Sequence, residues 1–255
     1  VEQYKRFKDM NVLLLTMDST SIEKPGFSFS ENVVIENLTR FIKDTKGRLF
    51  IATFASQVER ILAIINAAEK YGKKMIIEGR SMKTNIEIAR ELGLIKYKDD
   101  TVVQVEDIDR YPSEKLVILA TGAQGDEFAS LARIGNKTHK YIRLQPTDTI
   151  VLSSSVIPGN ERAVQKLKDN LSRQGARIIH REQMDVHASG HANRDETFWI
   201  HSKINPRFFM PMHGYHYMLR VHADIAKACG RSEDEIMVPD NGAVLEIQNG
   251  GEKIV

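Results

Sequence analysis

The sequence predicts an α/β protein with a mostly parallel β-sheet and flanking helices. Short apolar runs alternate with amphipathic segments from residue 49 to residue 180, and polar turn residues separate them. This alternation is typical of parallel strands joined by crossover helices. A chain of 255 residues with 42% hydrophobic residues is long enough for one large domain or two moderate ones.

Each expected element follows from its local pattern. The apolar runs predict strands at residues 12–17, 49–54, 74–78, 116–120, 148–152, 176–179 and 208–210. The first of these runs is continuous, which indicates a strand buried on both faces. Helical spacing of apolar residues predicts a helix that Ser30 and Glu31 open, and further helices at 58–71, 86–92, 161–173, 197–203 and 217–228. Residues 235–255 are expected to form short strands with turns at 240–242 and 249–251.

Composition and charge exclude several classes of protein. With 36 basic and 34 acidic side chains the net charge is +2, so nucleic-acid binding would need a local basic patch. The single cysteine, Cys229, excludes an internal disulfide framework and indicates a reducing compartment. No apolar run reaches the roughly 18 residues of a membrane span, and the first residues do not resemble a signal peptide. We therefore expect a cytoplasmic protein without a membrane partner.

Histidine and aspartate side chains follow three of the predicted strands. Asp18 ends the first apolar run, His187, Ser189 and His191 follow the sixth, and His213 follows the last. Histidine exchanges protons near neutral pH, its neutral form binds metals, and loops at strand ends commonly carry such sites. These residues predict a polar functional site. Four further histidines are interpreted as ordinary solvated or half-buried residues: His139, His180, His201 and His222.

Serine- and glycine-rich turns after other strands are candidates for holding phosphate. Residues 153–155 are three serines ahead of a helix, and Gly122 and Gly125 follow the strand at 116–120. Neither a three-glycine dinucleotide fingerprint nor a Walker phosphate loop is present. Basic residues gather near the same polar strand ends: Arg80, Lys83, Arg133, Lys137, Lys140 and Arg162. Such a patch could grip a phosphate backbone, or these could be ordinary solvated side chains.

Taken together, several short stretches resemble ribonuclease J. They are residues 16–20 with 25–26, 52–56, 79–82, 120–125, 153–155 with 158–161, 187–191 and 211–214, in that family's order across nearly the whole chain. Ribonuclease J belongs to the metallo-β-lactamase superfamily, in the branch with an inserted β-CASP domain. The resemblance implies a β-CASP domain at residues 30–190, with segments of a metallo-β-lactamase-like domain at 1–29 and 191–255.

The resemblance also implies a ribonuclease that uses two divalent metal ions, zinc or manganese, and cuts RNA internally and from a 5'-monophosphate end. His213 would match a metal ligand, and Asp18 would match an acidic residue that orients His191. His191 would donate a proton to the leaving oxygen or steady the scissile phosphate. The residues expected beside the RNA phosphates are Ser56, Arg80, Ser154, Ser155, His187 and Ser189. The family also tends to form homodimers through a C-terminal extension.

The chain departs from the family pattern in its metal ligands. The superfamily motif His-x-His-x-Asp-His is absent from the sequence, and one ligand histidine cannot hold two metals. We therefore expect the chain to be a fragment without the N-terminal half that carries this motif, inactive by itself, with an incomplete or absent metal centre. A smaller departure is Tyr215, which stands where the family commonly has Glu.

Three other interpretations stay open at this point. A non-catalytic RNA-binding or interaction module would bind RNA but copurify with little metal, so metal content separates it from a nuclease. A dinucleotide-binding protein is disfavoured because the glycine fingerprint is missing. A hydrolase of small molecules would prefer small esters to RNA.

Overall fold

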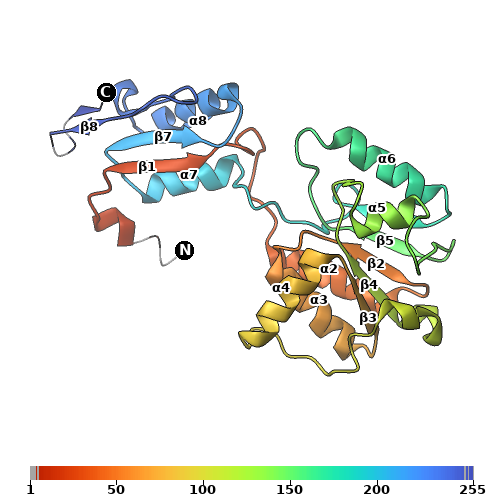
Figure 1. Cartoon of the computed structure of the whole chain (residues 1–255). Helices are drawn as coiled ribbons and strands as arrows, with labels where there is room; N and C mark the ends of the chain where they lie inside the picture. The colour runs from red at the N-terminus through yellow and green to blue at the C-terminus, as the bar shows by residue number, and fades with distance from the viewer. Residues whose placement is uncertain (1–3, 5, 250, 252, 255) are drawn as a thin grey trace. The chain divides into compact units, whose positions relative to one another are not determined.

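The computed structural model of the chain describes residues 4, 6–249, 251, 253 and 254. The chain divides into two compact units (Figure 1). Unit 1 consists of Val1–Ser28 and Ser189–Val255, and unit 2 is the continuous segment Phe29–Ala188. Unit 2 is therefore inserted into the sequence of unit 1.

Unit 2 contains a five-stranded sheet in which every strand runs parallel to its neighbours. From one edge to the other the order is β3 (Lys74–Glu78), β4 (Leu116–Ala120), β2 (Leu49–Ala52), β5 (Thr149–Leu152) and β6 (Arg177–His180). The central strand is β2, where Ile51 pairs with Leu119 on one side and with Val151 on the other. Because the strands are parallel, the turns that follow them meet at one edge of the sheet.

Helices cover both faces of this sheet (Figure 1). Alternate strand residues point to opposite faces, so Leu49 and Ile51 lie in one core cluster while Phe50 and Ala52 lie in the other. The first cluster includes residues of α2 (Glu31–Asp44), α3 (Val58–Lys70) and α4 (Arg80–Glu91), and the second includes residues of α5 (Ser130–Gly135) and α6 (Glu161–Ser172). Two 3-10 helices, η2 (Val105–Arg110) and η3 (Ser113–Lys115), precede β4. The predicted α/β fold, with a mostly parallel sheet and flanking helices, is confirmed.

Unit 1 is built around two parallel strands, β1 (Leu14–Asp18) and β7 (Phe208–Met212). Two helices, α7 (Arg194–Lys203) and α8 (His216–Ala228), lie on either side of β7 in the sequence. A short antiparallel pair, β8 (Ile247–Gln248) and β9 (Lys253–Ile254), comes near the C-terminal end. The 3-10 helices of this unit are η1 (Arg6–Asp9) and η4 (Glu233–Glu235). Phe209 of β7 is fully buried and anchors the core of the unit.

The structure corrects two local predictions. No residue of β1 is fully buried, so the prediction of a strand buried on both faces is wrong. Among the described residues β1 pairs only with β7, and a two-stranded sheet leaves strand edges open. The helix predicted from residue 86 begins at Arg80, because Met82 is buried one turn before Ile86.

The turn predicted at 249–251 includes Gly250, which lies outside the described residues. In the part of the chain that is described, no helix combines the length and apolar character needed to cross a membrane.

Candidate active site

Asp18 and His213 are brought together by the pairing of β1 with β7. In this ladder Asp18 is the register partner of Met212, and the backbone N–H of Ser19 donates to the Met212 carbonyl oxygen at 2.9 Å. His213 is the next residue, and its φ of 55° turns the chain at the end of β7. A left-handed φ is uncommon for a residue with a side chain and occurs mostly at turns and functional sites. The two side chains therefore meet at the carboxyl ends of the strands.

His191 reaches the same place because the start of α7 is tied to the segment that follows β1. The Glu196 carboxylate accepts hydrogen bonds from the Ser28 backbone N–H at 3.0 Å and from the Ser28 hydroxyl at 2.7 Å. Glu196 also forms the N-terminal capping box of α7 with Asn193. These contacts hold the residues just after His191 against the loop that continues from Asp18.

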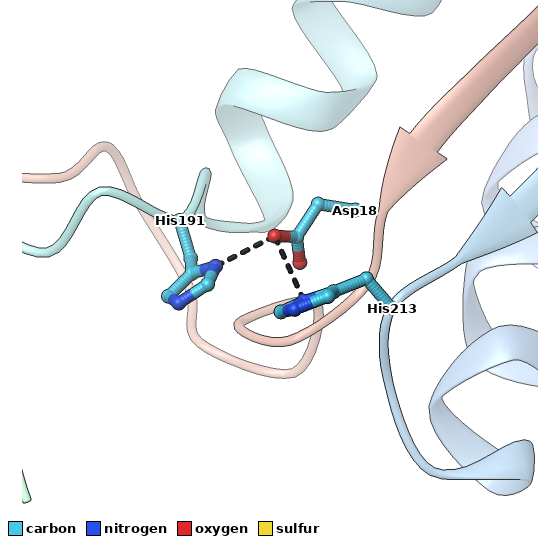
Figure 2. Close-up of side chains that lie close together, drawn as sticks. All are labelled: Asp18, His191 and His213. Carbon is cyan, nitrogen blue, oxygen red and sulfur yellow. Dashed lines mark hydrogen bonds and ion pairs between the residues drawn. The ribbon is translucent and has the colours of Figure 1, made fainter. Parts of the chain in front are cut away.

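The three side chains form one cluster, with the carboxylate between the two imidazole rings (Figure 2). Oδ2 of Asp18 lies 2.6 Å from Nδ1 of His191 and 3.2 Å from Nδ1 of His213. The two rings are stacked, with centroids 5.5 Å apart and planes 21° apart. About a third of each of the Asp18 and His191 side chains is exposed, and 66% of the His213 side chain is exposed. The cluster is open to a ligand from solvent.

Hydrogen bonds indicate which ring nitrogens carry protons. Burial raises the pKa of Asp18, but hydrogen bonds from Thr20 and His191 outweigh this effect and hold the pKa below its usual value, so the group is a carboxylate at neutral pH. A carboxylate only accepts, so Nδ1 of His191 carries a hydrogen. The Thr20 hydroxyl donates to the His213 carbonyl oxygen at 2.9 Å and therefore accepts from Nδ1 of the His213 ring, also at 2.9 Å. In its neutral form each ring then presents an unprotonated Nε2 to a ligand.

This arrangement fits a metal on His213 better than one shared by all three residues. Ligand atoms of Asp18, His191 and His213 do lie within 4.8 Å of one another. However, zinc ligands at about 2.1 Å in a tetrahedral site stand about 3.4 Å apart, whereas Asp18 Oδ2 and His191 Nδ1 are 2.6 Å apart, which is a charge-assisted hydrogen bond. A carboxylate that fixes Nδ1–H of a metal-binding histidine is a common outer support, and it leaves Nε2 as the ligand atom.

A second pair of histidines lies in the interior of unit 1, and Ser19, the residue after Asp18, connects this pair to the cluster. The Ser19 hydroxyl lies 2.9 Å from Nδ1 of His222, and Nε2 of His222 lies 3.3 Å from Nε2 of His201. Burial lowers the pKa of His222 to about 3, helped by the neighbouring His201, and burial lowers the pKa of His201 to about 4, helped by the charge of Arg231. Both rings are therefore uncharged at neutral pH.

The interpretation of His201, His222 and His139 as solvated or half-buried residues is wrong. All three are at most 7% exposed, because each finds a polar partner inside the protein. For His139 this partner is Glu78, whose carboxylate lies 3.0 Å from Nε2. His180 is half-buried, as predicted.

In unit 2, the predicted phosphate-binding residues follow the carboxyl ends of parallel strands. Ser56 and Arg80 follow β2 and β3, and both are exposed. Ser154 and Ser155 follow β5 and are joined to the turn after β4, because the Gln124 amide donates to the Ser154 hydroxyl at 3.3 Å and to the Ser155 carbonyl oxygen at 2.6 Å. Ser154 is buried and Ser155 is half-buried. Through their hydrogen bonds with Gln124 these serines support the turn at this edge of the sheet. All six basic residues predicted near the strand ends have exposed side chains: Arg80, Lys83, Arg133, Lys137, Lys140 and Arg162.

His187 is held in unit 2 by a buried arginine. Nη1 of Arg60 lies 3.0 Å from Nδ1 of His187 and 2.9 Å from the Ser153 carbonyl oxygen, and the same guanidinium makes two contacts of 2.6 Å with the Glu31 carboxylate. Arginine only donates, so Nδ1 accepts and Nε2 of His187 carries the hydrogen. Burial lowers the pKa of His187 to about 4, and the charges of Arg60 and Arg181 add to this effect. His187 is thus an uncharged donor at neutral pH.

Several residues that shape these sites have no recognisable sequence signal. Thr20 orients His213, and Arg60 with Glu31 orients His187. Arg60 stands in an amphipathic helix, where an arginine is normally taken as exposed, yet it is 1% exposed. Ser189 lies in unit 1, where its hydroxyl accepts a hydrogen bond from the His191 backbone N–H at 3.2 Å.

Comparisons with known proteins agree with this architecture. Residues 46–171 match the family model described as the beta-CASP domain of ribonuclease J. The chain is 38% identical over 247 residues to ribonuclease J of Synechocystis sp., covering 97% of this chain and 39% of that protein. It is 40% identical over 245 residues to ribonuclease J of Mycolicibacterium smegmatis, covering 96% of this chain and 44% of that protein. For ribonuclease J of Thermus thermophilus the identity is 40% over 236 residues, covering 92% of this chain and 41% of the relative.

The fold and these matches assign the chain to a class: it is an α/β chain that contains a β-CASP domain of the metallo-β-lactamase superfamily. Its β-CASP domain belongs to the ribonuclease J family, and the chain is homologous to ribonuclease J along almost its entire length. The chain spans about two fifths of the length of the curated relatives it matches.

Proposed function

We propose that the chain is part of a metal-dependent ribonuclease that cleaves RNA internally and from a 5'-monophosphate end, in RNA processing and decay. The observation that carries this proposal is the Asp18 carboxylate between two imidazole rings whose Nε2 atoms are free. The similarity to ribonuclease J supports RNA as the substrate. The single cysteine of the sequence supports a cytoplasmic location.

In this proposal Asp18 and His191 are the catalytic pair. The carboxylate accepts from Nδ1 of His191 at 2.6 Å and so fixes the ring with Nε2 directed away from it. When Nε2 takes a proton, the negative charge of Asp18 compensates for the positive charge of the ring. His191 can then donate that proton to the leaving oxygen of a phosphodiester or hydrogen-bond to the scissile phosphate.

His213 is proposed as a metal ligand through Nε2, with Asp18 and Thr20 holding its Nδ1–H. Two divalent ions such as zinc or manganese would activate water and stabilise the charge on the phosphate. The cluster of described residues offers one such imidazole, and the sequence lacks the His-x-His-x-Asp-His motif. We therefore expect no RNA cleavage by this chain alone.

The polar edge of unit 2 is proposed to bind RNA phosphates. Ser56 and Arg80 offer an exposed hydroxyl and an exposed guanidinium at the same sheet edge, and Ser155 follows the neighbouring strand. His187 adds an uncharged N–H donor, because Arg60 occupies its other nitrogen. Ser154 belongs to the same proposed set, and Ser189, in unit 1, is the remaining proposed phosphate contact. Contacts of this kind position a phosphate backbone without reading its sequence.

A non-catalytic RNA-binding module is the second candidate, and one observation favours it: with His191 assigned as proton donor, His213 is the one histidine of the described cluster left to bind a metal. Metal content separates the two. A module would bind RNA with little bound metal in every context, whereas a nuclease part would retain metal once the segment with the missing motif is present.

The test is degradation of a 5'-monophosphorylated RNA with added manganese or zinc. The chain alone should not cleave, and addition of the segment that carries the family's metal motif should produce cleavage. His191→Ala should abolish that restored cleavage. If the chain alone cleaves RNA and His191→Ala abolishes this cleavage, the metal assignment is wrong. If the restored cleavage survives His191→Ala, His191 is not catalytic.

A further inference from the structure

Two tyrosines stand exposed immediately after the ligand histidine. Tyr215 and Tyr217 are 61% and 52% exposed, although large aromatic side chains usually contribute to a core. Their rings are stacked, with centroids 6.2 Å apart and planes only 12° apart. Unit 1 therefore presents a pair of nearly parallel aromatic faces to solvent.

The position of this pair relative to the active site is fixed by its neighbours. Tyr215 is two residues from His213, which places their Cα atoms within about 7.6 Å. Between them lies Gly214, where an added Cβ would stand 3.3 Å from the Cβ of Ser19, the residue after Asp18. The turn is thus packed directly on the end of β1.

The second tyrosine lies near the same segment. Burial raises the pKa of Tyr217, and the Glu23 carboxylate, in the loop that continues from β1, adds to this effect. The Tyr217 side chain is nevertheless 52% exposed. The two tyrosines therefore lie beside the segment of chain that carries Asp18 and Thr20.

We infer that Tyr215 and Tyr217 form a stacking platform for a base of single-stranded RNA whose phosphate lies at the Asp18, His191 and His213 cluster. Unpaired RNA bases stack on exposed aromatic rings, and this interaction tolerates any base because every base has a π-face. Because Tyr215 is two residues from His213, one nucleotide is long enough to reach both. The inference rests on the proposed function and adds a contact to the base, which the phosphate-binding residues do not make.

Charged groups of both signs border the platform: the Glu23 carboxylate lies near the Tyr217 phenol, and Arg220 follows on α8. Arg220 is exposed on the same helix, one turn beyond Tyr217, and can approach a phosphate next to the stacked base. An aromatic surface bordered by a guanidinium is the combination that single-stranded nucleic-acid sites use.

The test is a binding titration of the full 255-residue chain with a fluorescently labelled, 5'-monophosphorylated single-stranded oligoribonucleotide. Tyr215→Ala and Tyr217→Ala should each weaken binding by roughly 5- to 150-fold, the range of one lost base stack. Tyr215→Phe and Tyr217→Phe keep the ring and should bind within about 2-fold of the unchanged chain. Phe198→Ala is the matched control, because Phe198 is an aromatic of unit 1 that is 46% exposed on α7.

Oligonucleotides with one abasic nucleotide at successive positions distinguish stacking from other contacts. At the stacked position the missing base should weaken binding to the unchanged chain but not weaken binding to the Tyr→Ala variants further. The inference would be overturned if the losses of affinity from the missing base and from the Tyr→Ala change simply added. It would also be overturned if the Tyr→Ala variants bound as well as the unchanged chain. Either result would leave the proposed function standing. No RNA binding by the unchanged chain would overturn both the inference and the RNA-binding part of the proposed function.

Discussion

Unit 1 contains two pairs of histidines that have similar spacing and opposite environments. His191 and His213 lie at the open ends of β1 and β7, and His201 and His222 lie in the interior, with ring centroids 5.5 Å apart in both pairs. The outer rings are nearly parallel and share a carboxylate, whereas the inner rings are perpendicular and share a neutral hydrogen bond. The outer pair keeps both Nε2 atoms free for a ligand, and the inner pair uses both of its Nε2 atoms on itself.

The difference shows that partner and burial, rather than residue type, decide what a histidine does. The Asp18 carboxylate contacts both rings of the outer pair and would compensate for a positive charge there. The inner pair lies among apolar side chains, with the Phe209 ring 4.5 Å from His201 and 4.8 Å from His222. An uncompensated charge is costly in such a place, so the inner rings serve packing and hydrogen bonding.

The largest expected effect comes from removing the charge that defines the outer pair. Asp18→Asn keeps the size of the side chain but loses the carboxylate that holds His191 and His213. In the reaction restored by the metal-motif segment, we expect the cleavage rate to fall by about 10²- to 10⁴-fold, the usual contribution of a positioned proton donor. Asp224→Asn, an exposed carboxylate change on α8, is the control and should leave the rate unchanged. A rate within about 3-fold of normal for Asp18→Asn would contradict this role.

Breaking the inner pair should destabilise unit 1. His222→Ala removes a fully buried ring and leaves the Ser19 hydroxyl and the His201 ring without their partner. We expect the free energy of unfolding to fall by about 2–4 kcal/mol. Urea denaturation followed by fluorescence of Trp199, the single tryptophan, measures this change within unit 1. The same change at His216, whose side chain is 50% exposed, should cost less than about 0.5 kcal/mol.

The pH dependence of stability should sharpen the contrast between the pairs. The folded state lowers the pKa of His201 to about 4 and of His222 to about 3, from 6.5. Above pH 6.5 both rings are uncharged in the folded and the unfolded states, so their protonation does not lower the free energy of unfolding. As the pH falls below 6.5 the unfolded state binds protons that the folded state does not, so stability should fall by about 1.4 kcal/mol per pH unit for each ring.

Urea unfolding at pH 7, 6 and 5, read from Trp199, measures this slope. The His222→Phe variant has one buried imidazole fewer, so its stability should depend less steeply on pH over the same interval. An equal slope in the variant would show that His222 does not contribute.

The smallest expected effect is on stability when an outer ring is removed. His213→Ala deletes a side chain that is 66% exposed, so we expect the free energy of unfolding to change by less than about 0.5 kcal/mol. Urea denaturation beside His222→Ala makes the comparison direct. A loss of 2 kcal/mol or more in His213→Ala, as estimated for a buried site, would mean that the outer pair is structural.

The fold class and the residue types at the strand ends can both be predicted from the sequence. Apolar runs such as 49–52 and 116–120 alternate with amphipathic segments, and that periodicity depends only on local composition. The resemblance to ribonuclease J likewise depends on short stretches read in order, and the β-CASP match confirms it. Asp18, His191 and His213 are recognisable as candidate site residues because they follow such apolar runs.

Which of these residues are in contact, and which are buried, depends on how distant segments of the chain pack together. The contact between Ser19 and His222 joins residues 203 positions apart, and the contact between Arg60 and His187 joins residues 127 positions apart. The apolar patterns of the helices that contain Arg60 and His222 allow either residue to face solvent. The sequence therefore does not predict that both side chains are buried. Hydrogen-bond partners and burial are set by chain segments that meet in space, and they in turn set the protonation state of each histidine.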